Sequence, residues 1–145
     1  MKNNYFSIAL LFIILIVSIS KNVYASNVIS VTDGYIRASI PGSDVTAAYM
    51  TINNAGDIAM TLEKVIGTLS DRIEIHEHSM THGMMTMRQV DNVTIDAKSK
   101  VVLQPSGLHL MIFSLKQKIT EKELVTITLY FSNNTKINIQ LPVYR

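Results

Sequence analysis

The sequence predicts an all-β protein built as an antiparallel β-sandwich. Short runs in which apolar, often β-branched residues alternate with polar ones recur along residues 26–145, and clusters of Asn, Gly, Pro and Ser separate them. No segment of this part of the chain shows the apolar period of an amphipathic helix. Many short strands in a single small domain are typical of a sandwich of two packed sheets.

The N-terminal segment, residues 1–25, is predicted to be a signal peptide rather than part of the fold. Lys2 is followed by an uncharged apolar stretch over residues 5–20, and the small residues Val23 and Ala25 suit recognition by signal peptidase. An uncleaved membrane anchor is the alternative, but sixteen uncharged residues are fewer than the roughly 20 that a spanning helix needs. We therefore expect cleavage after Ala25, export to the periplasm, and a mature domain over residues 26–145 that does not itself span the membrane.

The mature domain is expected to have no net charge and no disulfide. Removing residues 1–25 takes away Lys2 and Lys21 and no acidic residue, so the 13 basic residues become 11 and equal the 11 acidic ones. A neutral balance does not support the basic surface that binds nucleic acid. Because the chain has no cysteine, we expect its stability to come from packing of the core.

The predicted strands follow one another with short turns between them. Turn-rich stretches lie at residues 40–44, 53–57, 104–107 and 132–135. One domain of this size is large enough to bury its own core. In chain order, the predicted strands are Val28–Arg37, Thr46–Asn53, Met60–Leu69, Arg72–His78, Met84–Val90, Val101–Gln104, Leu108–Leu115, Leu124–Phe131 and Lys136–Val143.

Strand geometry turns two of these segments into a candidate site. Residues 73–89 hold three of the four histidines and four of the eight methionines. Because side chains alternate along a strand, His76 and His78 face away from the isoleucines that we expect in the core. On a later strand, His109 and Met111 share one face, about 6.6 Å apart along the strand.

Imidazole and thioether ligands together indicate a soft metal, Cu(I) before Zn, Mg or Ca. Thioethers carry no proton and do not close into disulfides, so such ligands persist in an oxidising compartment. Taken singly, each residue keeps a structural alternative, because methionine is a common core filler and a histidine on an apolar strand is more often a buried residue satisfied by hydrogen bonds. The coincidence of His76, Met87, His109 and Met111 favours copper.

The spacing of these four residues resembles the signature of a known family. Ten residues separate His76 from Met87, twenty-one separate Met87 from His109, and one separates His109 from Met111. This spacing is similar to the H-x10-M-x21-H-x-M signature of the periplasmic copper chaperones called PCuAC, also known as DUF461. The stretches TAAYMTIN and QPSGLH also resemble that family's T-A-A-Y-x-x-I-x-N strand and K-P-G-G-x-H turn.

The resemblance implies a cupredoxin-like β-sandwich that binds one Cu(I) through His76, Met87, His109 and Met111. It also implies a chaperone and not an enzyme. In this family the copper goes to the CuA centre in subunit II of cytochrome c oxidase, often with a Sco-type thiol protein as a further partner.

This sequence departs from the family's pattern in the segment after the first ligand, and the departure predicts a further metal site. His78 and His82 stand where relatives usually carry methionine or a small residue. Together with Met80 and Met85, they form a candidate set for a second copper site, either a weaker one or one that binds Cu(II). The alternative is that all four are exposed residues that bind no metal.

Four competing functions of a secreted β-sandwich can be weighed against this interpretation. A copper-zinc superoxide dismutase needs more histidines than the four present, and a blue-copper electron carrier needs a cysteine thiolate, so both are excluded. A periplasmic copper buffer, which sequesters copper without delivery, would use the same ligands as a chaperone and stays open as the alternative. A metal-free interaction domain with a methionine-rich surface also stays open.

Overall fold

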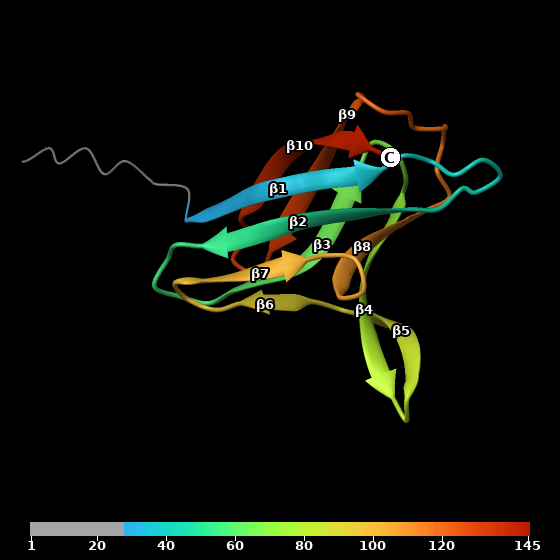
Figure 1. The fold of residues 1–145 in the computed structure, drawn as a ribbon. Coiled ribbons are helices and arrows are strands. Elements are labelled where there is room, and N and C mark those ends of the chain that lie inside the picture. Colours follow the sequence, from blue (N-terminus) through green and yellow to red (C-terminus); the bar gives the residue numbers. More distant parts are fainter. Residues whose placement is uncertain (1–27) are drawn as a thin grey trace, which may run out of the picture.

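The computed structural model describes residues 28–145, which form ten strands and no helix (Figure 1). The predicted signal peptide, residues 1–25, lies outside the described residues. Within residues 28–145, there is no helix of the length and apolarity needed to cross a membrane. The strands are β1 (Ile29–Arg37), β2 (Thr46–Asn54), β3 (Met60–Gly67), β4 (Arg72–Thr81), β5 (Met84–Val90), β6 (Val93–Ile95), β7 (Ser99–Leu103), β8 (Leu108–Phe113), β9 (Leu124–Phe131) and β10 (Lys136–Tyr144).

All but one of these strands lie where the sequence predicts them. β5 and β9 have the predicted bounds, whereas β4 continues past His78 to Thr81. The sequence pattern misses β6, because its 3 residues are too few to show an alternation of apolar and polar side chains.

The strands pair along one continuous path that folds over into two layers. The order along the path is β5-β4-β8-β2-β1-β10-β9-β3-β6, and β7 pairs with β2. The layer that contains β1, β2 and β7 lies in front of β10, β9 and β3 in Figure 1. The predicted all-β sandwich is therefore confirmed.

The expectation of an antiparallel sandwich is corrected at one strand pair. β1 and β10 pair in parallel, with Ile36 opposite Val143 and Arg37 opposite Tyr144. The amide of Ala38 also donates a hydrogen bond to the carbonyl oxygen of Tyr144 at 2.7 Å. Because backbone groups at a strand edge need partners, this short parallel pairing satisfies the end of β1 and links the two layers.

The core lies between the layers and fixes the direction in which the strands of the site face. Leu110 and Ile112 of β8 and Ile75 of β4 are buried in it. Because successive side chains of a strand point to opposite faces, the residues that alternate with these three point away from the core. That outer face carries the predicted metal ligands.

β4 and β5 form a hairpin that projects from the sandwich (Figure 1). Its turn consists of His82 and Gly83, whose φ angles are 52° and 78°. Two consecutive residues with positive φ are typical of a type I′ turn, whose twist suits a two-residue hairpin. This turn pairs Thr81 with Met84 and so decides which methionines of the hairpin share a face.

Candidate metal centre

The four predicted ligands lie on the outer face of three neighbouring strands, β5, β4 and β8. Between β4 and β8, His76 lies directly opposite His109. Met111 follows His109 on the same face of β8, and Met87 of β5 lies opposite His78, the next residue after His76 on the outer face of β4. Directly opposed residues have Cβ atoms about 4.5–5.5 Å apart. The fold therefore gathers all four residues on one face.

His109 is the most deeply buried of the four. It is 3% exposed, its ring centroid lies 6.4 Å from that of Tyr49, and the ring of His78 stacks on it at 5.0 Å. Burial is the main cause that lowers the pKa of His109, against the opposing effect of a hydrogen bond to Gly107. Burial thus favours the neutral imidazole, which is the form that binds metal.

The hydrogen bond of His109 also fixes which nitrogen can bind a metal. Nδ1 lies 2.9 Å from the carbonyl oxygen of Gly107. A carbonyl oxygen only accepts, so Nδ1 carries the proton and Nε2 keeps its lone pair. Metal-binding histidines commonly donate their other ring N–H to a carbonyl or carboxylate in this way.

His76 is oriented by a carboxylate on its own strand. Its Nε2 lies 2.8 Å from Oε2 of Glu74, whose Oε1 accepts a hydrogen bond from Arg72 at 2.7 Å. The pKa of Glu74 is lowered from its ordinary value, mainly by the hydrogen bond with His76 and next by the hydrogen bond with Arg72. The ionised carboxylate can only accept, so Nε2 of His76 donates and the lone pair lies on Nδ1.

That Nδ1 atom of His76 is a buried nitrogen without a hydrogen-bond partner among the described residues. Buried polar atoms are nearly always paired, so an exception calls for a physical explanation. A lone pair that is kept free by the Glu74 hydrogen bond, on the face that gathers two thioethers, is suited to a metal ion.

Sequence reasoning missed these two orienting groups. Strand alternation places Glu74 on the face of His76, and a carboxylate two residues from a histidine on one strand face is a usable signal. The carbonyl of Gly107 leaves no such signal, because its position depends on the turn in which the amide of Gly107 donates to the carbonyl oxygen of Gln104.

The two methionines are more open than the two histidines. Met87 is 49% exposed, and Met111 is partly buried and borders a surface groove of about 230 Å³ together with Ala47 and Tyr49. Within residues 28–145, no three His, Cys, Asp or Glu side chains are placed to hold a metal ion. The side chains gathered on this face offer sulfur as well as nitrogen, and that donor set suits Cu(I).

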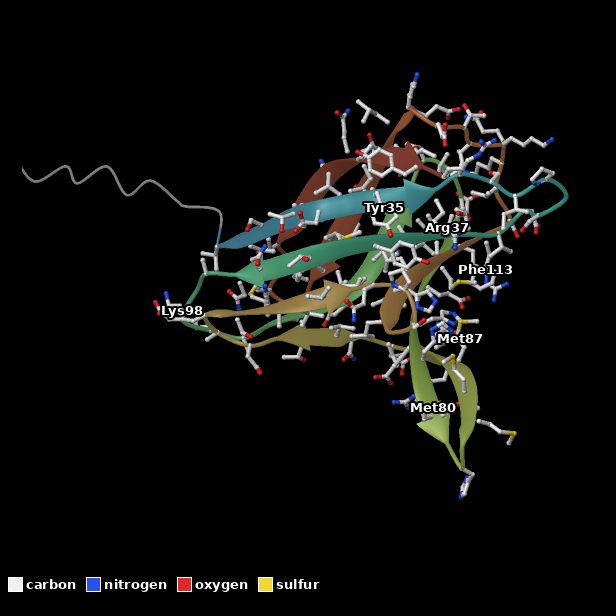
Figure 2. All side chains as sticks on the ribbon, viewed as in Figure 1. Tyr35, Arg37, Met80, Met87, Lys98 and Phe113 are labelled. Carbon is white, nitrogen blue, oxygen red and sulfur yellow. The ribbon has the colours of Figure 1, made fainter. Side chains whose placement is uncertain are left out.

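Three of the four residues predicted for a secondary site share the outer face of the hairpin. Met80 lies opposite Met85, and the neighbouring pair on that face is His78 with Met87. Figure 2 shows Met87 near the base of the hairpin and Met80 farther along it. The fourth residue, His82, lies in the turn and not on a strand.

Comparison with known proteins assigns the chain to a family. The family described as "Putative lipoprotein LpqE-like" matches residues 29–143, almost the whole described chain. The chain belongs to the LpqE-like family. The PCuAC resemblance predicted from the sequence is thereby confirmed. The chain is also similar to "Putative lipoprotein Lxx21020" from Leifsonia xyli subsp. xyli (strain CTCB07). The two are 26% identical over 116 residues, which cover 79% of this chain and 69% of that protein.

Solved structures show the same fold. The copper-bound PCuAC domain from PmoF2 is 20% identical to this LpqE-like protein and matches with a TM-score of 0.69, covering 83% of this chain and 95% of that domain. The solution structure of Cu(I)-DR1885 from Deinococcus radiodurans is 29% identical and matches with a TM-score of 0.67, covering 88% and 85% of the two chains. The predicted fold class is confirmed as that of PCuAC domains.

Proposed function

We propose that this LpqE-like protein is a copper chaperone that holds one Cu(I) through His76, Met87, His109 and Met111. The observation that carries the proposal is a pair of imidazoles, each with one nitrogen engaged by an oxygen atom and the other free, on the same face as two thioethers. The structure of DR1885, a protein 29% identical to this chain, is that of a Cu(I) form, and it supports the same metal here.

The open position of the methionines supports delivery over permanent storage. A partner can approach Met87 from solvent and Met111 from its groove, whereas His109 is covered on the outer face. An incoming ligand would replace a thioether first, and Cu(I) would pass between proteins without a change of oxidation state. The covered histidines would hold the ion until that exchange begins.

The proposed recipient is the CuA centre in subunit II of cytochrome c oxidase, with a Sco-type thiol protein as a further partner and the periplasm as the compartment. The lipoprotein names of the family and of the relative support export. The 145 residues contain no cysteine, so the proposal does not include a lipid attached through a cysteine of this sequence. The proposed role is carriage of a metal ion and not catalysis.

Competition with a Cu(I) chelator tests the four-residue site. Loss of a group that hydrogen-bonds to a metal ligand typically lowers metal affinity by about 10–100-fold. Because His109 and Met111 are proposed as ligands themselves, we expect His109→Ala and Met111→Leu each to lower Cu(I) affinity by more than that. Met84→Leu is the matched control, because Met84 lies on the opposite face of the hairpin from Met87. If both ligand variants stay folded and bind Cu(I) as tightly as the unmodified protein, the assigned site is wrong.

Transfer separates a chaperone from a copper buffer. The Cu(I)-loaded protein would be mixed with the soluble CuA domain of subunit II, the two proteins separated, and copper measured in each. A chaperone is expected to lose its copper to the CuA domain faster than free Cu(I)-chelator complexes of equal affinity do. A buffer would retain the copper, and that result would replace delivery with sequestration.

A further inference from the structure

The hairpin of β4 and β5 has two chemically different faces. On the outer face, which continues that of the metal centre, the register pairs His78 with Met87 and Met80 with Met85. Met84 alternates with Met85 and therefore belongs to the opposite face. The sulfur and imidazole side chains of the outer face thus extend from the metal centre toward the turn.

Packing does not explain Met80 and Met85. They are 67% and 64% exposed, and β5 is exposed at every position from Met84 to Gln89. A methionine that fills a gap in a core is covered by other side chains, and these two are not. They lie directly opposite each other, which brings their Cβ atoms to about 4.5–5.5 Å and lets both flexible thioethers reach one ion.

His78 supplies a third donor beside this pair. It precedes Met80 by two residues on the same strand face, a rise of about 6.6 Å that both long side chains can bridge. Its Nδ1 is buried and has no hydrogen-bond partner among the described residues. Its ring stacks on that of His109 at 5.0 Å, so His78 touches the metal centre while belonging to the hairpin.

We propose that His78, Met80 and Met85 form a second Cu(I) site on the hairpin, next to the four-ligand centre. One imidazole and two soft thioethers are neutral donors that suit Cu(I). The identity of the metal rests on the proposed function, but the three ligands are distinct from the four of the inner site. His82, which lies in the turn, is not needed to complete the three donors.

The position of this outer site gives it a role in copper transit. It is more exposed than the inner site, and Met87 lies opposite His78 between the two. Cu(I) moves inward when Met87 and then His109 replace Met80 and Met85, one ligand at a time. His76 and Met111 then replace His78. No electron is transferred in this exchange, and neutral imidazole and thioether ligands release no proton.

Anaerobic titration with Cu(I), counted against graded amounts of a competing chelator, tests the outer site. The unmodified protein is expected to bind two equivalents, the tighter first. The double variant Met80→Leu/Met85→Leu keeps apolar side chains of similar size on the hairpin and is expected to bind one. Met84→Leu is the matched control, since Met84 has the same 67% exposure as Met80 on the opposite face, and it is expected to bind two.

Failure of the outer site and failure of the proposed function give different results. A single equivalent in the unmodified protein, or two equivalents in the double variant, overturns the outer site and leaves the inner one standing. Loss of the second equivalent in Met84→Leu overturns the assignment to the outer face. In Met111→Leu the weaker equivalent is expected to persist while the tight one is lost. An unmodified protein that binds no Cu(I) overturns both proposals.

Discussion

The sandwich and the β4–β5 hairpin differ in how much of their side-chain surface is buried. In β9, buried side chains alternate regularly with partly buried ones, and residues from both layers meet in one apolar core. In β5, six of seven positions are exposed, and its methionines face solvent. The sandwich is therefore stabilised by burial, which is worth roughly 25 cal/mol per Å² of apolar surface, while the hairpin gains little from it.

The proposed metal centre lies where these two regions meet, and the difference between them explains its composition. Leu110 and Ile112 pack into the core and so fix the position of β8. His109 lies on the opposite side of this strand and is also buried. β5 has no such constraint and contributes the half-exposed Met87. In the proposed centre the rigid region would supply a fixed imidazole, and the open region an exchangeable thioether.

The largest expected effect is on stability, from truncation of the core behind the site. Leu110→Ala removes a side chain with 0% exposure and is expected to destabilise the domain by about 2–5 kcal/mol. Met84→Ala on the hairpin is expected to change stability by about 0.5 kcal/mol or less, because Met84 is 67% exposed. Denaturant unfolding of both variants measures the contrast, and equal losses would show that the hairpin belongs to the cooperative core.

The next effect is on copper affinity, from the carboxylate that orients His76. Glu74→Gln keeps the size of the side chain but replaces an obligate acceptor, and we expect Cu(I) affinity to fall by about 10–100-fold. Glu77→Gln is the matched control, because Glu77 lies on the opposite face of β4 and pairs with Arg88. Chelator competition on both variants measures the effect, and equal affinities would remove Glu74 from the site.

The smallest effect is expected for the ion pair on the reverse face of the hairpin. Nη2 of Arg88 lies 2.7 Å from Oε2 of Glu77, and the two side chains are 66% and 35% exposed. Exposed pairs contribute about 0–1 kcal/mol, so Arg88→Ala is expected to lower the unfolding free energy by no more than that and to leave Cu(I) affinity unchanged. A tenfold loss of Cu(I) affinity in this variant would show that the two faces are not independent.

The sequence predicted most of the sandwich because its strands carry a strong alternating pattern. It also predicted which side of β4 and β8 the candidate ligands occupy, since Ile75 and Leu110 mark the core side. The parallel pairing of β1 with β10 could not be predicted, because strand direction at a sheet edge depends on the path of the whole chain. The stacking of His78 on His109 likewise depends on the register between two distant strands.

X-ray absorption fine structure at the copper edge tests the central claim most directly, because it reports the atoms bound to the metal. In the Met80→Leu/Met85→Leu protein, which lacks the outer site, loaded with one equivalent of Cu(I), we expect two nitrogen and two sulfur neighbours, and loss of one sulfur when Met111→Leu is added. A spectrum without sulfur neighbours, or one that Met111→Leu and Met87→Leu both leave unchanged, would contradict a centre built from His76, His109 and these two methionines.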